Sequence, residues 1–266
     1  MNSLPLHQRY PWRLFWFLLV AEVLAAVAII PIAKDMLGAV VVKLERPPIP
    51  LPLLILIGAV QNLALLGITL WLGLKLSRRL GLRMPLLESF AGEKPAASVR
   101  LAPILASGLL VGIVLGVILV SCLLLLAPRL PNLPFLIAAR LPIWKRFLAC
   151  FYGGIYEELL TRLFLLSTIA WIVNRTWRRP TPQLSNFAFW FANIFTAIAF
   201  GLGHLPSASL FMPITAIVVV AALLLNGIAG IAFGYLFRTR GLEAAMIAHF
   251  TADFFIYVVG AGFIKQ

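Results

Sequence analysis

The stretch Phe151-Tyr-Gly-Gly-Ile-Tyr-Glu-Glu-Leu-Leu-Thr-Arg162 places two adjacent carboxylates and one guanidinium in a segment otherwise apolar enough to cross a bilayer. Each such charge at mid-membrane costs roughly 2.5 to 3.5 kcal/mol on insertion scales, so three unpaired charges would cost about 9 kcal/mol. Glu158 and Arg162 are four residues apart and can pair across one helical turn. Glu157 is rotated by about 100° from Glu158 and has no local partner. We therefore expect its partner to come from another part of the chain.

The composition is too apolar for an ordinary soluble domain. Over 266 residues, 62% are hydrophobic and 12% charged, with a mean hydropathy of +1.01. These values predict an all-α, polytopic membrane protein. The net charge of +13 does not point to nucleic acid, because the Lys and Arg residues lie almost entirely between apolar runs. They are typical of topology signals and contacts with lipid headgroups, so membrane lipid is an expected partner and nucleic acid is not.

Apolar runs long enough to span a bilayer predict about seven membrane helices. The run at 210–237 contains Asn226-Gly227, and a break there would make eight. We expect one integral bundle, with a polar cavity formed by its later spans. The seven runs are 12–33, 52–76, 101–127, 143–173, 186–205, 210–237 and 242–264.

The distribution of basic residues predicts the orientation of this bundle. Of the 22 Lys and Arg residues, 13 fall on the side of the N-terminus and 8 on the opposite side, and Arg162 lies within a span. Cytoplasmic loops carry the excess of Lys and Arg. We therefore expect a multi-pass protein of the plasma membrane with a cytoplasmic N-terminus.

Glycines recur every four residues in the third span, at Gly108, Gly112 and Gly116. Such spacing is typical of a close contact between helices, although glycine is also simply common in membrane helices. We attach no chemistry to these glycines.

Two of the three histidines also lie in apolar runs. The fifth run ends in Phe200-Gly-Leu-Gly-His204, and the seventh contains His249-Phe-Thr-Ala-Asp253, with His and Asp on one helical face. Any one of these groups alone is explained by an interhelical hydrogen bond. Together with Glu157 and Glu158 they would each cost energy unless they meet in one polar cavity. Such a cavity would hold a carboxylate and an imidazole to activate water, as amide hydrolysis requires.

In these motifs the sequence resembles the CPBP family of intramembrane proteases, which includes the type II CAAX prenyl endopeptidases and the Abi bacteriocin-immunity proteins. The matching motifs are Glu157-Glu158-x-x-x-Arg162, Phe200-x-x-x-His204 and His249-x-x-x-Asp253, in this order. The resemblance covers roughly residues 145–255. We therefore divide the chain into unassigned N-terminal spans at 1–140 and a CPBP-like catalytic core at 141–266.

The resemblance implies an endopeptidase that cuts a peptide or lipidated peptide near the membrane surface. Glu157 would be the general base on the attacking water, with His204 beside it. His249 and Asp253 would hold the oxyanion or orient the scissile peptide. Glu158, Arg162 and Phe200 would be supporting residues.

Whether the implied mechanism uses zinc stays open. His204, His249 and Glu157 are a reasonable zinc set, but no His-Glu-x-x-His helix is present and the ligands would converge from separate helices. A metal-free mechanism based on the glutamate is the alternative.

At Asp253 many family members have Asn. An ionised Asp cannot donate a hydrogen bond to an oxyanion, so Asp253 would have to be protonated, orient His249 through its ring N–H, or bind metal.

Two alternative functions fit the same residues. The chain could be a non-catalytic immunity or scaffold protein of the same fold, or a proton-coupled transporter, because buried Glu, His and Arg also mark ion pathways.

The heights of the site residues on straight helices disagree. Counted from the cytoplasmic ends, Glu157 and His204 lie about 22 to 26 Å deep, and His249 only about 10 Å. Either the last helix begins inside the bundle or the expected ends of the spans are displaced by two turns.

Overall fold

The computed structural model describes residues 10–41, 51–93, 99–177 and 184–264, and within these ranges the chain is helical, with no β-strand. The predicted all-α class is confirmed. The elements are α1 (Trp12–Ala28), α2 (Ile30–Val41), α3 (Leu51–Arg79), α4 (Pro85–Phe90), α5 (Leu101–Leu126), α6 (Pro134–Ala138), α7 (Ile143–Phe151), η2 (Tyr152–Glu157), η3 (Leu159–Leu166), α8 (Ser167–Thr176), α9 (Asn186–Gly203), α10 (Leu205–Ser209), α11 (Ala216–Arg240), α12 (Leu242–Phe254), η4 (Phe255–Val259) and η5 (Gly260–Phe263).

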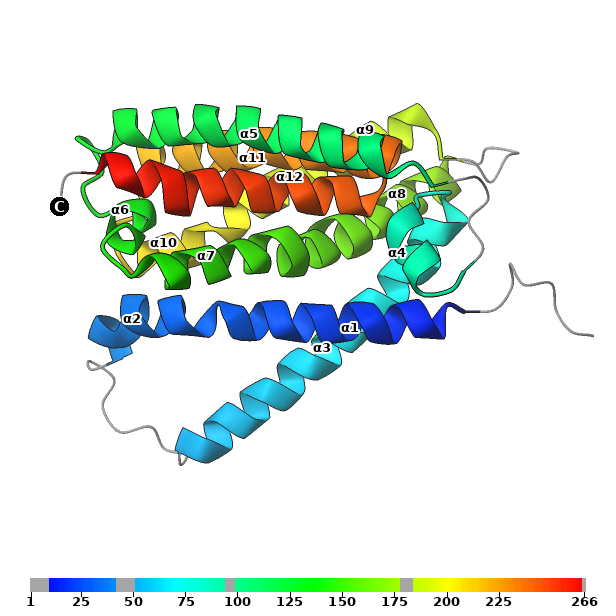
Figure 1. Ribbon diagram of the computed structural model, residues 1–266, viewed down its shortest axis with the longest axis horizontal. Helices are drawn as coiled ribbons and strands as arrows, with labels where there is room; N and C mark the ends of the chain where they lie inside the picture. The colour runs from blue at the N-terminus through cyan, green and yellow to red at the C-terminus, as the bar shows by residue number, and fades with distance from the viewer. Residues whose placement is uncertain (1–9, 42–50, 94–98, 178–183, 265–266) are drawn as a thin grey trace, which may run out of the picture.

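The long helices form a bundle with two distinct ends (Figure 1). The start of α1, the short helix α4 and the end of α8 lie at one end, called here the α4 end. The short helices α6 and α10 and the last residues of the chain's final helix lie toward the other end, called here the α6 end. α7, η2, η3 and α8 follow one another without interruption and form a single helical rod from Ile143 to Thr176.

Six helices in the described ranges are long and apolar enough to cross a membrane. They correspond to six of the seven predicted spans. The remaining one, at 143–173, lies in the rod formed by α7 to α8, which carries six charged residues. The six helices are Trp12–Met36, Val60–Arg79, Leu101–Leu126, Asn186–Ser209, Ala216–Arg240 and Leu242–Phe263.

The break proposed at Asn226-Gly227 is absent, because α11 runs through both residues. Asn226 donates from Nδ2 to the carbonyl oxygen of Ala222 at 3.0 Å, so its polar side chain is satisfied inside the helix. The eighth span that such a break would have made is therefore not present at this position, and a count of seven or eight spans is not confirmed.

The glycine stripe of α5 packs directly against α12. A Cβ built on Gly112 would lie 2.6 Å from the carbonyl oxygen of Ala248 and 2.6 Å from Cβ of Thr251. Gly108 and Gly116 face α12 in the same way. The predicted close contact between helices is confirmed, and it fixes α12 against the bundle.

The start of α12 lies inside the bundle, beneath α4. Leu242 is fully buried, and its N–H donates to the carbonyl oxygen of Arg83 at 3.2 Å. Glu243 is 6% exposed, and its Oε1 accepts from the N–H of Leu87 at 2.8 Å. Arg83 and Leu87 thus cover the first turn of α12. This helix therefore begins inside the bundle and not at its surface. This supports the explanation that the last helix begins inside the bundle, which accounts for the shallow depth predicted for His249.

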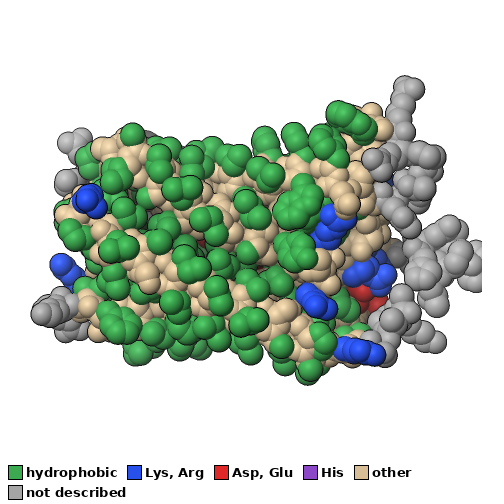
Figure 2. Space-filling model, turned by 90° about the horizontal axis from the view of Figure 1, so that it is seen from above, with side chains coloured by type: hydrophobic (Ala, Val, Ile, Leu, Met, Phe, Trp, Pro, Cys, Tyr) green, Lys and Arg blue, Asp and Glu red, His purple; other side chains and the backbone are tan. Residues whose placement is uncertain are grey.

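The outer surface is apolar along the bundle and basic at its ends. On the face shown in Figure 2, hydrophobic side chains cover the middle, and Lys and Arg side chains lie toward the two ends. This is the pattern of a protein that crosses a bilayer.

Removing the carboxylate of Glu243 should loosen the start of α12. We expect Glu243→Ala to lower the free energy of unfolding by about 1 to 3 kcal/mol, because the N–H of Leu87 loses its acceptor. Glu243→Gln keeps an acceptor oxygen and should lose less. Thermal unfolding in detergent measures both variants, and a midpoint for Glu243→Ala equal to that of the wild type would contradict this role.

Candidate active site

A buried network of three side chains lies at the centre of the bundle. Arg162 Nη1 lies 3.0 Å from Glu158 Oε1, and His249 Nδ1 lies 2.7 Å from the same oxygen. The side-chain exposures of Arg162, Glu158 and His249 are 1%, 0% and 7%. A carboxylate only accepts hydrogen bonds, so Nδ1 of His249 carries the hydrogen. Nε2, on the opposite side of the ring, remains for the cavity.

Aromatic rings enclose the charged part of this network. The guanidinium carbon of Arg162 lies 4.8 Å from the ring centroid of Phe200 and 5.3 Å from that of Phe233. Phe233 also stacks on His249, with the ring centroids 4.7 Å apart. Contacts of a cation with aromatic faces stabilise a desolvated guanidinium. The imidazole of His249 is therefore held by a hydrogen bond at one edge and by an aromatic ring on one face.

Glu157 differs from its neighbour because its side chain reaches the cavity. It is 21% exposed, whereas Glu158 is fully buried. Its Oε2 lies 3.6 Å from His249 Nε2, which is too long for a hydrogen bond but close enough for attraction. Glu157 is the last residue of the π-helical turn η2, and Glu158 stands between η2 and the second π-helical stretch η3; such turns are frequent at functional sites. The partner expected for Glu157 is thus His249 on α12.

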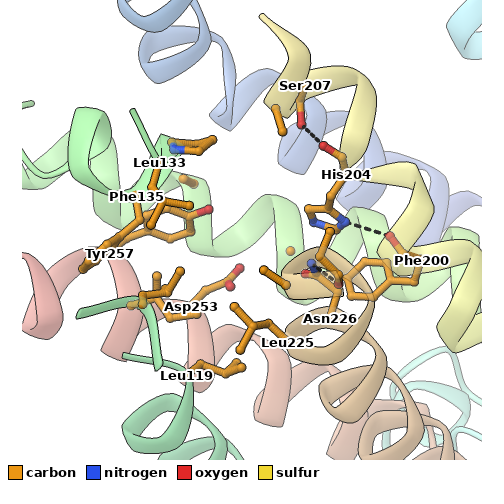
Figure 3. Close-up of a pocket in the computed structure, with 18 of the residues that line it drawn as sticks. Leu119, Leu133, Phe135, Phe200, His204, Ser207, Leu225, Asn226, Asp253 and Tyr257 are labelled. Atoms are coloured by element: carbon orange, nitrogen blue, oxygen red, sulfur yellow. Dashed lines mark hydrogen bonds between the residues drawn. The ribbon is translucent and has the colours of Figure 1, made fainter. Parts of the chain in front are cut away.

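His204 follows α9 at the point where α10 begins. Its Nδ1 lies 2.8 Å from the carbonyl oxygen of Phe200, and since a carbonyl only accepts, Nδ1 carries the hydrogen. In the described part of the chain Nε2 has no recorded hydrogen-bond partner. Figure 3 shows His204, Asn226 and Asp253, each from a different helix, around one common space. The ring of Phe200 contacts both imidazoles, with centroids 4.7 Å from His204 and 5.7 Å from His249.

Asp253 lies one turn after His249 and packs against the backbone of η2. Its Oδ2 is 3.8 Å from His249 Nε2, so no hydrogen bond joins them. A Cβ built on Gly153 would lie 2.0 Å from this oxygen and 3.0 Å from His249 Nε2. Only a glycine at position 153 allows this approach. Glu158, rather than Asp253, accepts the ring N–H of His249.

These groups line a cavity of about 260 Å³. Glu157, His204, His249 and Asp253 form its polar part, together with Asn226. The rest of the wall is mostly apolar and comes from Ile29 after α1 and from α5, the segment that includes α6, α7, α10, α11 and η4. The predicted meeting of polar groups from three spans in one cavity is therefore what the structure shows for these side chains.

Comparison with known families points to the same part of the chain. Residues 139–255 match the family model described as type II CAAX prenyl endopeptidase Rce1-like. This segment, called here the Rce1-like segment, is similar to that family. The match confirms the resemblance predicted from the motifs. No curated protein and no solved structure matches the chain.

The Rce1-like segment contains all the predicted site residues, but they do not all touch. Glu157 and Asp253 lie near Nε2 of His249, and Glu158 and Arg162 lie behind it. No ion pair or hydrogen bond joins His204 to these groups in the described ranges, although the ring of Phe200 contacts both imidazoles.

Sequence reasoning missed three further cavity residues. Gly153 lies in the stretch Phe151–Arg162, where the adjacent pair Gly153-Gly154 is a sequence signal of close packing. Tyr152 and Tyr257 also line the cavity, but nothing in their spacing set them apart from the aromatic residues that face lipid.

The donor atoms of the Rce1-like segment do not fit a metal site. The described residues contain no group of three His, Cys, Asp or Glu side chains arranged to hold an ion. In the suggested zinc set, Nδ1 of His249 is hydrogen-bonded to Glu158 and Nδ1 of His204 to Phe200, so Nε2 is the remaining nitrogen of each ring, but these side chains do not form a group of three around one point in the described ranges. The mechanism proposed below therefore routes no step through a metal.

A methyl group at position 153 should disrupt the site without unfolding the bundle. We expect Gly153→Ala to push Asp253 and His249 aside and to abolish peptide cleavage, because the new Cβ would overlap Asp253 Oδ2. Gly67→Ala on α3 is the matched control, since a Cβ there meets nothing within 4 Å. Cleavage rates and unfolding midpoints in detergent test both variants, and full activity of Gly153→Ala would contradict the geometry.

Proposed function

We propose that this protein is an intramembrane endopeptidase in which Glu157 activates the attacking water. The observation that carries the proposal is the different environment of the two adjacent glutamates. Glu158 is buried and paired with Arg162 and His249. Glu157 is partly exposed to the cavity beside His249 Nε2. One carboxylate is free to exchange a proton, and the other fixes the imidazole.

In the first step, Glu157 takes a proton from water as the water oxygen attacks the scissile carbonyl carbon. Nε2 of His204, with its hydrogen on Nδ1, is an acceptor that can hold the second hydrogen of this water. Two acceptors from different helices orient the lone pair of the water toward the substrate. Positioned general bases of this kind contribute roughly 10² to 10⁴ in rate.

The developing oxyanion requires a donor. His249 is that group when Nε2 also carries a proton, because Glu158 already holds Nδ1–H and Nε2 is the ring nitrogen that lies beside Glu157 and Asp253. Asp253 then stabilises His249 by charge and is not itself the donor. Glu157 passes its proton to the leaving nitrogen, the C–N bond breaks, and a carboxylic acid and an amine are released.

The substrate we propose is a peptide, or a lipidated peptide, with apolar groups near the scissile bond. Leucines and other apolar side chains of α5, α11 and the short helices form most of the cavity wall. This wall favours apolar side chains or a lipid chain by the same burial that stabilises a protein core. A prenyl group fits this chemistry but is not required by it.

We place the protein in the plasma membrane with the N-terminus in the cytoplasm. The support is the excess of Lys and Arg on the N-terminal side, 13 residues against 8. With this orientation, the α4 end of the bundle is cytoplasmic.

Removing the proposed base should abolish turnover and leave the fold intact. We expect Glu157→Gln and His204→Ala each to reduce cleavage of a peptide library by about 10² to 10⁴ in rate. Ser121→Ala, on the exposed face of α5, is the control and should cleave like the wild type. Unchanged turnover in Glu157→Gln would contradict the assignment of Glu157 as the general base. Proton flux in liposomes that depends on pH and gives no peptide products would favour a transporter instead.

A mechanism based on the glutamate also predicts independence from metal. Purified, active protein should contain well under one equivalent of zinc by elemental analysis, and dialysis against a chelator should leave the cleavage rate unchanged. One zinc per chain, lost together with activity and restored with it, would show that the metal-free mechanism is wrong.

A further inference from the structure

We infer that the side-chain amide of Asn226 binds the backbone of the substrate, by pairing with the N–H and the C=O of one residue of an extended peptide. Asn226 is then a substrate-binding residue on α11, in addition to the groups that carry out the chemistry. That the ligand is a peptide rests on the proposed endopeptidase function, whereas the availability of this amide to a ligand does not.

Close packing between α9 and α11 sets the height of Asn226 in the bundle. A Cβ built on Gly230 would lie 3.1 Å from Cα of Ala197. One built on Gly201 would lie 3.0 Å from the carbonyl oxygen of Ala222. Asn226 lies midway between Gly230 and Ala222 on α11, so it stands opposite the last two turns of α9.

These turns of α9 carry Phe200, and the amide therefore lies at the level of the two imidazoles. The ring of Phe200 contacts both His204 and His249. Asn226 lines the same cavity as both histidines. In Figure 3 it borders the space that His204 and Asp253 face. A peptide that reaches the water-activating groups thus passes this amide.

The hydrogen bond within α11 leaves part of the amide of Asn226 available. A side-chain amide has two N–H groups and one carbonyl oxygen. One N–H donates to the carbonyl oxygen of Ala222 at 3.0 Å. In the described ranges the second N–H and Oδ1 have no recorded partner, and Oδ1 is not one of the buried polar atoms that lack a partner. Oδ1 is therefore accessible from the cavity, and the amide keeps one donor and one acceptor for a ligand.

Asn193 on α9 shows how an asparagine that only joins helices is placed. It is 1% exposed, and its Nδ2 donates to the carbonyl oxygen of Ile231 on α11 at 3.0 Å. A Cβ built on Gly234 would overlap its Oδ1, and Asn193 is not a lining residue of the cavity. For Asn226 no hydrogen bond to another helix is recorded in the described part of the chain. Joining helices therefore does not account for its amide.

Asn226 is also the only side-chain amide among the described lining residues. The ionised carboxylates of Glu157 and Asp253 only accept hydrogen bonds, and Nε2 of His204 accepts while Nδ1 carries the hydrogen. A peptide bound in this mostly apolar cavity needs both a donor and an acceptor for its backbone, because an unpaired buried amide costs free energy.

The geometry of an extended peptide matches one amide. In an extended chain the N–H and the C=O of one residue point to the same side, as in a hydrogen-bonded pair of an antiparallel sheet. The Oδ1 and the remaining N–H of Asn226 can pair with both. The residue that pairs with Asn226 must have a backbone N–H, so proline is excluded at that position of the substrate.

A scan of the substrate backbone tests this pairing. A fluorogenic peptide with apolar residues around the scissile bond is made as a series in which one N–H at a time, outside that bond, is replaced by an ester oxygen. We expect one position at which the ester lowers kcat/KM of the wild type about 2- to 12-fold by raising KM, because one hydrogen bond is lost. A series without a sensitive position would overturn the inference.

The variant Asn226→Leu completes the scan. It should lower kcat/KM for the unmodified peptide about 5- to 100-fold, because both hydrogen bonds are lost, and the ester at the sensitive position should cause no further loss. Asn226→Ala replaces it if the larger apolar side chain prevents folding. Thr239→Val is the matched control, since Thr239 donates to the carbonyl oxygen of Tyr235, four residues earlier on the same helix and outside this cavity. An ester penalty in Asn226→Leu equal to that of the wild type would overturn the inference.

Binding to a protein that does not cleave separates this inference from the proposed function. Glu157→Gln protein in detergent should bind the labelled, unmodified peptide, and the added change Asn226→Leu should raise Kd about 5- to 100-fold, as measured by fluorescence anisotropy. Equal Kd values, or no binding to either protein, would overturn the inference. If Kd rises as expected while the wild type cuts no peptide, the proposed function fails and the binding role of Asn226 stands.

Discussion

The architecture of the site depends on one shared oxygen, Glu158 Oε1, which forms an ion pair with Arg162 and accepts a hydrogen bond from His249. In the middle of an apolar bundle, none of these three groups is stable alone. Breaking a buried pair by removing one partner typically costs about 3 to 5 kcal/mol, because the remaining charge is left uncompensated. The network therefore ties α12 to the long rod at one height, and this height brings Nε2 of His249 beside Glu157. The hydrogen bond from His249 to Glu158 and the aromatic contacts around these charges also orient the imidazole of His249.

Close backbone packing on two sides of α12 makes this height possible. The glycine stripe of α5 approaches one face, and Gly153 of η2 lies against Asp253. The contact between Glu243 and Leu87 then fixes the start of α12. Small residues let the helices approach, and a few polar contacts set the register, which is how helices associate where lipid removes the hydrophobic driving force.

Much of this arrangement could be predicted from sequence, and the limits have physical causes. Isolated charges in apolar runs are costly, so the charged residues were expected to meet in one cavity. This expectation predicted both the cavity and the polar residues that line it. The pairing of Glu158 with Arg162 followed from helical spacing. The contact between Glu158 and His249 spans 91 residues and depends on where α12 begins, which is set by α4 and not by any local pattern. Asn226 suggested a helix break because its polarity was visible in the sequence, whereas its bond to the carbonyl of Ala222 was not.

The wall of the cavity has a consequence for how the chain is divided. The Rce1-like match begins at residue 139, yet Ile29, Leu119, Leu123 and the segment from Leu130 to Phe135 all line the cavity. A fragment restricted to the matched residues would keep every polar group of the site and lose one side of its enclosure. Lipid and water would then reach Glu157, and the electrostatic interactions that depend on a low dielectric would weaken. The N-terminal spans thus help to exclude lipid and water from the cavity, and this exclusion keeps the electrostatic interactions of its few charged groups strong.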